Sequence, residues 1–165
     1  MNKSLLFAGL LVAGLFFFAS DAEAQLKAYN TSIGIRGGTS VGGSVKRFIS
    51  DHDAVELMVY TRWKGWVGNL LYEHHMDIRE FEGLEWYVGG GGHYGVWKVG
   101  KSDPPWVYKA TEDYAAFGID AIVGLDYNIN RTSWFISLDW KPSYNFQDFT
   151  DLWWDEIAFT LRYAF

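Results

Sequence analysis

Two stretches of the chain combine histidine with carboxylates in a way that could support chemistry. The first holds Glu73, His74 and His75 in a row, with Asp77 two positions further on. Imidazole and carboxylate groups are ligands for divalent metals such as zinc. Neighbouring side chains of a strand point to opposite faces, so His74 and His75 could share one metal only in a loop. We therefore predict a polar strand end here, with no metal site and no other cofactor.

The second stretch contains His93, which could act as a general base if an inward-facing carboxylate such as Asp120 oriented its ring. His75 is another candidate base. Nucleophilic catalysis would also need a serine within hydrogen-bond reach of the imidazole, and no serine is convincingly placed next to His93. We favour a histidine that is satisfied by internal hydrogen bonds, and we predict no catalytic residue.

Glycine-rich segments match two enzyme motifs only superficially. Gly90, Gly92 and Gly95 fit G-x-G-x-x-G, and the segment from Gly38 to Gly42 fits G-x-S-x-G. The first motif needs a strand-helix-strand unit and the second a strand-to-helix turn, and no helical pattern follows either segment. We predict instead that the glycines at 89–92 let a strand bend or bulge and leave room for bulky neighbours inside the fold.

The elements that position these residues are strands, because apolar and polar residues alternate with period two along most of the chain. The pattern predicts eight strands, at residues 31–37, 44–49, 54–63, 66–75, 84–99, 115–127, 133–141 and 154–165. Residues 37–43 form a turn-rich connection, and residues 101–112 and 142–152 form irregular loops. Ten membrane-crossing strands of ~9 to 11 residues would leave too few residues for the connections.

The last predicted strand has a purely apolar face and a polar face. Ile157, Phe159 and Leu161 alternate with Thr160 and Arg162. Aromatic residues make up 19% of the chain, nine residues are Trp, and the mean hydropathy is only −0.08. After residue 24 there is no long apolar run. This combination predicts an all-β fold, an eight-stranded antiparallel up-and-down transmembrane β-barrel with a packed polar interior.

If the apolar faces look outward, charged side chains of both signs project into the lumen. An eight-stranded barrel is only wide enough for its own side chains, and buried charges must pair. We predict a lumen charge network and no open pore. Its members are Arg36, Glu56, Arg62, Glu73, Asp120, Asp126, Asp139, Lys141, Glu156 and Arg162.

The predicted topology also sorts aromatic residues toward the strand ends, where Trp and Tyr form girdles at the two membrane interfaces. Trp63, Trp66, Trp140 and Trp154 fall at the outer ends. Trp86, Tyr127, Trp134 and Phe165 fall at the inner ends.

The first 24 residues predict a cleavable secretory signal peptide. Lys3 precedes an apolar stretch from Leu5 to Ala19, and the small-x-small sequence Ala22-Glu23-Ala24 follows it. Residues 25–165 would then form the barrel domain. The net charge is −6, or −5 without residues 1–24, so nucleic acid is not an expected partner. The chain has no cysteine, which excludes a disulfide scaffold.

The closing segment Leu161-Arg162-Tyr163-Ala164-Phe165 resembles the C-terminal signature of bacterial outer-membrane β-barrels. That resemblance implies that Phe159, Leu161, Tyr163 and Phe165 are the signal read by the barrel insertion machinery. Together with this ending, four further segments are similar to small outer-membrane barrels of the Bacteroidetes type, which are broadly like OmpA transmembrane domains. They are Gly34-Ile35-Arg36-Gly37-Gly38, Trp86 to Trp97 (WYVGGGGHYGVW), Gly124-Leu125-Asp126-Tyr127 and Ser137-Leu138-Asp139-Trp140-Lys141-Pro142.

The first functional hypothesis is therefore a monomeric, non-enzymatic barrel of the cell outer membrane. It would contact outer-membrane lipids and have a structural or surface-interaction role through its loops at 101–112 and 142–152. One alternative is a lipid-modifying enzyme on the same barrel, with His93 or His75 as its base. Another is a soluble periplasmic carrier like the lipocalins, which would require an apolar lumen and a polar exterior.

Overall fold

The computed structural model of the chain describes residues 30–98, 113–146 and 152–165. The predicted signal peptide and the loop at 101–112 lie outside these ranges. No helix among the described residues is both long and apolar enough to cross a membrane. The elements are β1 (Thr31–Gly38), β2 (Val41–Phe48), β3 (Asp53–Arg62), β4 (Gly65–Asp77), β5 (Leu84–Trp97), β6 (Tyr114–Asn128), the short 3-10 helix η1 (Ile129–Arg131), β7 (Trp134–Trp140), β8 (Ser143–Asn145), β9 (Leu152–Trp153) and β10 (Ile157–Ala164).

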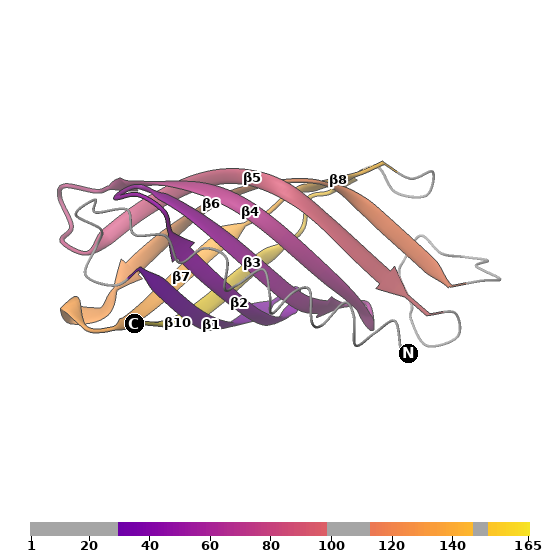
Figure 1. Cartoon of the computed structure of the whole chain (residues 1–165), viewed down its shortest axis with the longest axis horizontal. Helices are drawn as coiled ribbons and strands as arrows, with labels where there is room; N and C mark the ends of the chain where they lie inside the picture. The colour runs from indigo at the N-terminus through magenta and orange to yellow at the C-terminus, as the bar shows by residue number, and fades with distance from the viewer. Residues whose placement is uncertain (1–29, 99–112, 147–151) are drawn as a thin grey trace.

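These strands form one closed antiparallel barrel (Figure 1). Each of β1 to β5 pairs with the next strand in the chain, β5 pairs with β6, and β1 pairs with β10, which closes the sheet. β7 and β8 both pair with β6, one after the other along its length. β10 pairs with β7 and β9 pairs with β8, so β9 and β10 also count as one barrel strand. The ten segments therefore make eight barrel strands, as the period-two pattern predicts.

Several predicted strand boundaries differ from the observed ones, most clearly at the second strand and in the predicted loop at 142–152. The second strand begins at Val41 and not at Ser44, so the connection from β1 is only Thr39 and Ser40. Glycine allows this early start, because a Cβ at Gly42 would lie 2.2 Å from the carbonyl oxygen of Val59 on β3. The predicted loop at 142–152 contains β8 and the start of β9, since Ser143 pairs with both Asp120 and Trp153.

The pairing is interrupted between β7 and β8 and, opposite it, between β9 and β10, where the chain has one residue more. Lys141 and Pro142 lie between the pairs Trp140–Ile157 and Ser143–Trp153, and three residues, 154–156, lie opposite them. This is the count of a β-bulge. Pro142 has no N–H to donate, but its carbonyl oxygen accepts a hydrogen bond from Ala121 at 3.0 Å. The bulge exposes Trp154 and directs Trp153 and Glu156 into the lumen.

The predicted bulge in β5 is absent, because every residue from Glu85 to Val96 pairs one to one with residues of β4 and of β6. The glycines serve a close approach of two backbones instead. A Cβ at Gly89 would lie 2.3 Å from the carbonyl oxygen of Tyr72, and one at Gly91 would lie 1.9 Å from that of Leu70. No side chain fits at these two inward positions, although Tyr87 and His93 on the same face of β5 do have room.

The strands are tilted relative to the barrel axis (Figure 1). Pairing partners followed around the sheet from Ser32 on β1 end at Trp153 on β9, through Lys46, Glu56, Leu71, Gly91, Asp120 and Ser143. Ser32 lies at the barrel end that carries the C-terminus, here called the C-terminal end, and Trp153 lies at the opposite end, here called the far end. Residues far apart in sequence therefore meet at the same height in the lumen.

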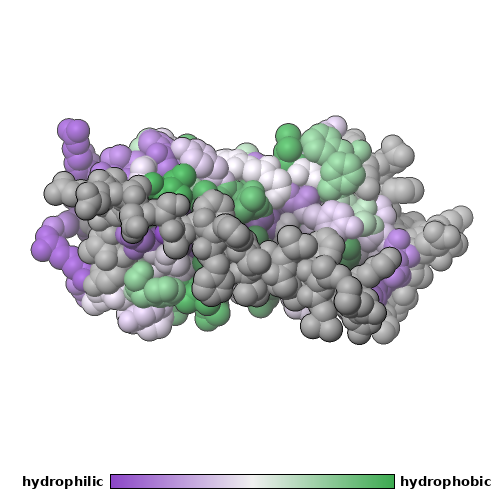
Figure 2. All heavy atoms as spheres, in the orientation of Figure 1, coloured by the Kyte–Doolittle hydropathy of each residue, from purple (hydrophilic) through white to green (hydrophobic). Residues whose placement is uncertain are grey.

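The outer wall is apolar. Ile35, Leu70, Ile119 and Phe159 are each more than half exposed. Figure 2 shows patches of hydrophobic residues along the described part of the visible wall, and hydrophilic residues towards both ends, most clearly at the left, where the C-terminal end lies. The barrel is therefore apolar outside.

Candidate functional site

The lumen holds a dense set of buried charges. All ten charged residues assigned to it from the sequence are buried there. Lys46 joins them, although Arg47 directly after it left the facing of this strand ambiguous in the sequence. Lys46 is the register partner of Glu56, so only strand pairing identifies its side. Five cationic and six carboxylate side chains thus share the described part of the lumen.

Towards the C-terminal end, two cations share three carboxylates. Arg162 Nη2 lies 2.6 Å from Glu56 Oε1, and Arg162 Nη1 lies 3.9 Å from Asp126 Oδ1. Lys46 Nζ lies 2.7 Å from Glu73 Oε2, 3.4 Å from Glu56 Oε2 and 4.0 Å from Asp126 Oδ2. Arg162 also donates to Ser137 Oγ. Each buried charge therefore has a partner of opposite sign.

Towards the far end, Glu156 is the shared acceptor. Its carboxylate lies 3.5 Å from Arg36 Nη2, 3.3 Å from Arg62 Nη1 and 3.3 Å from Lys141 Nζ. Tyr60 donates its hydroxyl to the same carboxylate at 3.2 Å. The bulge that turns Glu156 inward therefore lets one carboxylate join three cations.

Arg62 also binds Asp155, which lies nearer the barrel end: its Nη2 lies 2.6 Å from Asp155 Oδ1. Asp155 lies in the bulge between β9 and β10 and is half exposed. Burial acts to raise the pKa of the Asp155 carboxyl, but the hydrogen bond and positive charge of Arg62 outweigh it, and the pKa is lowered. Sequence reasoning did not single out Asp155, because the bulge that directs it is not visible in the alternation.

An aromatic cluster lies beside Arg62 at the far end. The Trp153 ring packs edge-on against those of Trp63 and Trp97, at 5.4 and 5.7 Å between centroids. The Arg62 guanidinium lies 3.8 Å above the Trp63 ring, and Trp97 donates its indole N–H to the Arg62 carbonyl at 3.0 Å. These residues cover the charge cluster at this end.

The position of Trp63 differs from the predicted outer girdle. Trp63 and Lys64 form a two-residue hairpin turn with positive φ angles of 48° and 60°, as in type I′ turns. The Trp63 ring is partly buried against the buried lumen residues. The turn geometry, which alternation does not encode, directs this ring over the barrel end.

The other seven girdle residues are all exposed on the outer wall: Trp66, Trp140 and Trp154 in the outer set, and Trp86, Tyr127, Trp134 and Phe165 in the inner set. Trp140 donates its indole N–H to the Trp154 carbonyl at 2.6 Å. Trp140 does not end its barrel strand, because β8 continues to Asn145. At the C-terminal end, Trp134 packs edge-on against Tyr163 at 5.1 Å.

His93 is held between two partners that leave no nucleophile beside it. Its Nδ1 lies 3.0 Å from Asp120 Oδ1 and its Nε2 lies 2.9 Å from Asn145 Oδ1. Ser143 donates to Asp120 and not to His93. The predicted pairing of His93 with Asp120 therefore exists, but the position of the nucleophile is taken by an amide.

The serine of the G-x-S-x-G match is also engaged elsewhere. Ser40 lies in the turn between β1 and β2, where it is buried and donates to Glu156 at 3.4 Å. A strand and not a helix follows it, so the local geometry is not that of a hydrolase elbow.

Glu73 and His75 share the inward face of β4, and His74 between them points outward, as alternation on a strand requires. His75 is buried, with Nε2 3.3 Å from Glu73 and Nδ1 3.1 Å from Glu85, and its ring stacks on Tyr87 at 4.9 Å. His74 points outward to Asp53. In the part of the chain that the structure describes, no group of three or more His, Cys, Asp or Glu side chains could hold a metal.

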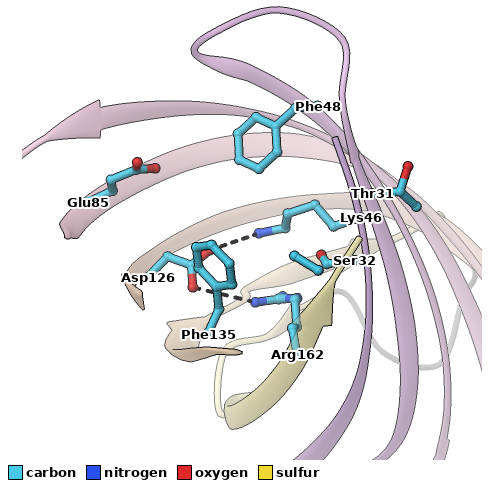
Figure 3. Close-up of a pocket in the computed structure, with 9 residues that line it drawn as sticks. Thr31, Ser32, Lys46, Phe48, Glu85, Asp126, Phe135 and Arg162 are labelled. Carbon is cyan, nitrogen blue, oxygen red and sulfur yellow. Dashed lines mark ion pairs between the residues drawn. The ribbon is translucent and has the colours of Figure 1, made fainter. Parts of the chain in front are cut away.

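A cavity of about 40 Å³ lies at the C-terminal end of the lumen. Figure 3 shows Asp126 facing both Lys46 and Arg162, with the rings of Phe48 and Phe135 on the same cavity. Charged and hydroxyl-bearing residues line this cavity together with apolar side chains, and its size gives room for a few water molecules beside the charge network.

Comparison with solved structures shows the same fold in two proteins. The N-terminal β-barrel domain of Pseudomonas aeruginosa OprF aligns with a TM-score of 0.66 and 18% identity, over 83% of this chain and 98% of that domain. Neisserial surface protein A (NspA) aligns with a TM-score of 0.55 and 14% identity, over 82% of this chain and 94% of its own. No family model matches the chain, and no match was found among curated proteins.

Proposed function

We propose that this chain is an integral β-barrel protein of the bacterial outer membrane, without an open pore and with a structural or surface-interaction role. One observation carries the proposal: on β10 a charged side chain is buried and an apolar side chain is exposed, the reverse of what a protein in water shows. Arg162 is 1% exposed, whereas Phe159 on the same strand is 55% exposed. In water, this arrangement would lose the hydrophobic stabilisation of folding. In lipid, it is the arrangement that lowers the free energy.

The height of the apolar wall supports a bilayer as its surroundings. On β6, Phe117, Ile119, Val123, Leu125 and Tyr127 are exposed. At ~3.3 Å per residue, the span from the first to the last is about 33 Å along the strand. A tilt of ~40° reduces this to about 25 Å, the height of the apolar band of outer-membrane barrels. A soluble carrier would need the opposite distribution, with an apolar lumen and a polar wall.

The packed lumen supports the absence of a pore. Charged side chains from strands that are not neighbours meet at hydrogen-bond distance in the lumen, as Arg162 of β10 and Glu56 of β3 do at 2.6 Å. Moving an ion through the lumen would require breaking several such pairs. We therefore expect the purified barrel to give no steady single-channel conductance in planar bilayers, and large, stable open steps would contradict this part of the proposal.

Export by a signal peptide and insertion by the barrel machinery are part of the same proposal. Residues 1–24 would serve as the signal peptide, and Phe159, Leu161, Tyr163 and Phe165 would be read by the insertion machinery. All four of these side chains are at least 36% exposed on one face of β10 or just after it, which supports their being available to another protein or to lipid. The Bacteroidetes-type origin and a monomeric state belong to the same proposal.

A surface role is supported by the shared barrel of Neisserial surface protein A. Trp97 and Tyr114, and likewise Asn145 and Leu152, are strand ends at the far end of the barrel. If the C-terminal end faces the periplasm, the chain between these strand ends, which includes the predicted loop at 101–112 and part of that at 142–152, is available to partners outside the cell.

Cell fractionation combined with gel mobility tests the location. We expect the chain in the outer-membrane fraction, and we expect the unheated sample to migrate differently from the boiled sample, because a folded barrel resists cold detergent. As a control, a variant lacking Phe165 should accumulate unfolded if the C-terminal residues are the insertion signal. Recovery of the native chain in the soluble periplasmic pool would reject the proposal.

A further inference from the structure

The two exposed histidines of the chain lie side by side. Of the four histidines, His75 and His93 are buried and engaged in the lumen, whereas His52 and His74 are exposed at the C-terminal end of the barrel. The centroids of their rings lie 6.1 Å apart, with 53° between the planes. His52 belongs to the turn between β2 and β3, and His74 belongs to β4, so only the fold brings them together.

The backbone fixes both residues. His75 donates its backbone N–H to the His52 carbonyl at 2.6 Å, which ties the turn to β4. Asp53, next to His52, is the register partner of His74. Within the turn, the Ser50 hydroxyl accepts hydrogen bonds from the backbone N–H groups of Asp53 at 3.0 Å and His52 at 3.4 Å. The pair is therefore anchored at two adjacent positions of one hairpin.

Asp53 determines which nitrogen of His74 carries the proton. Its Oδ1 lies 2.8 Å from His74 Nδ1, and a carboxylate accepts, so Nδ1 is the N–H donor and the Nε2 lone pair is available when the ring is neutral. Asp53 also accepts from the Tyr72 hydroxyl at 2.7 Å and the Ser50 hydroxyl at 2.6 Å. A carboxylate oriented in this way behind an imidazole is the usual outer shell of a metal-binding histidine.

We propose that His52 and His74 form a binding site for a divalent transition-metal ion of the zinc type. Zinc binds imidazole nitrogen at about 2.0 to 2.1 Å, which places the ring centroids of two ligands on one ion roughly 5 to 6 Å apart. The observed separation of 6.1 Å is within reach after a small rotation of the exposed His52 ring. Two imidazoles supply the protein ligands, and water completes the coordination. Nitrogen ligands favour zinc, nickel or copper over magnesium or calcium.

Calorimetric titration of the folded, full-length mature barrel with Zn²⁺ tests the site. The protein carries no polyhistidine tag and is kept in detergent micelles. We expect one Zn²⁺ per barrel and no binding of Mg²⁺. His52→Gln and His74→Gln should each weaken Zn²⁺ binding by at least about tenfold, because each removes one of two ligands. Asp53→Asn keeps both imidazoles and should weaken binding by roughly 10-fold to 100-fold.

Arg131→Gln is the matched control, since Arg131 is also exposed at the C-terminal end and pairs only with the exposed Glu82 among the contacts described. It should bind Zn²⁺ as the native chain does. Unheated gel mobility shows that each variant is folded. Imidazole resonances of His52 and His74 should shift together on addition of Zn²⁺, whereas those of His75 and His93 should not. The proposal is overturned if the double variant His52→Gln/His74→Gln binds Zn²⁺ with native affinity, or if Mg²⁺ displaces Zn²⁺ at equal concentration.

Discussion

Arg36 and Asp139 form a two-pronged ion pair in the lumen between strands that are not neighbours. Arg36 Nη1 and Nη2 lie 2.7 and 2.6 Å from the two carboxylate oxygens of Asp139, and both side chains are fully buried. β10 lies between β1 and β7, which carry them. The pair therefore links three adjacent strands at the closure of the barrel, where the first strand meets the last.

Arg36→Met should lower the free energy of unfolding by about 3 to 5 kcal/mol, because it leaves the Asp139 carboxylate buried without its partner. The double variant Arg36→Met/Asp139→Leu should be more stable than the single variant, since it removes the uncompensated charge. Urea unfolding in lipid vesicles, followed by Trp fluorescence, measures both. Arg131→Gln, which breaks an exposed pair, should cost no more than about 1 kcal/mol. A single variant as stable as this control would show that the buried pair contributes little.

Arginine on the outer wall should destabilise the barrel according to depth. Val123 lies near the middle of the exposed face of β6, and Tyr127 lies near its end. We expect Val123→Arg to cost about 2 to 4 kcal/mol and Tyr127→Arg about 0 to 1 kcal/mol in lipid vesicles. Refolding yield and urea unfolding measure the difference. Equal costs at the two depths would argue against a bilayer around this wall.

Gly91→Ala should disturb the contact between β4 and β5. The new Cβ would lie 1.9 Å from the Leu70 carbonyl oxygen, so the strands must separate at a cost of about 1 to 3 kcal/mol. Gly37→Ala is the matched control, because its Cβ would meet nothing within 4 Å. Urea unfolding of both variants gives the comparison. If Gly91→Ala is as stable as Gly37→Ala, the close approach of these backbones is not needed for the fold.

The contact between Arg62 and Asp155 should contribute to stability only above acidic pH. The pKa of Asp155 is lowered in the folded barrel, so its contribution is fully present above the unfolded value of about 3.9. This contribution declines as the pH falls below that value and is lost as it falls through the lower pKa of the folded state. Asp155 is half exposed, so we expect no more than about 1 kcal/mol.

The measurement compares the native chain with Asp155→Asn at several pH values. The difference in unfolding free energy should stay constant from pH 7 to about pH 5 and narrow below about pH 4. A difference that grows as the pH falls would contradict a lowered pKa of Asp155 in the folded barrel.

The sequence by itself determined how many barrel strands there are and, for every strand except the second, which side faces outward. Alternation is a local property of an extended backbone, so Phe159 and Arg162 take opposite sides wherever β10 lies. The eight-stranded count followed from the spacing of such segments. The alternation failed where the backbone is irregular: the bulge at 154–156, the interruption at Pro142, and the hairpin turn that places Trp63 over the barrel end.

Only the tertiary structure decided which side chains meet. Arg36 and Asp139 are 103 residues apart, and Lys46 on β2 meets Glu73 of β4 and Asp126 of β6 only because the closed barrel brings these strands around one lumen. His52 and His74 become a pair only when the turn before β3 is bonded to β4. The physical reason is that closure and strand tilt fix the height of every residue in the barrel, and these depend on hydrogen bonds between all eight barrel strands at once.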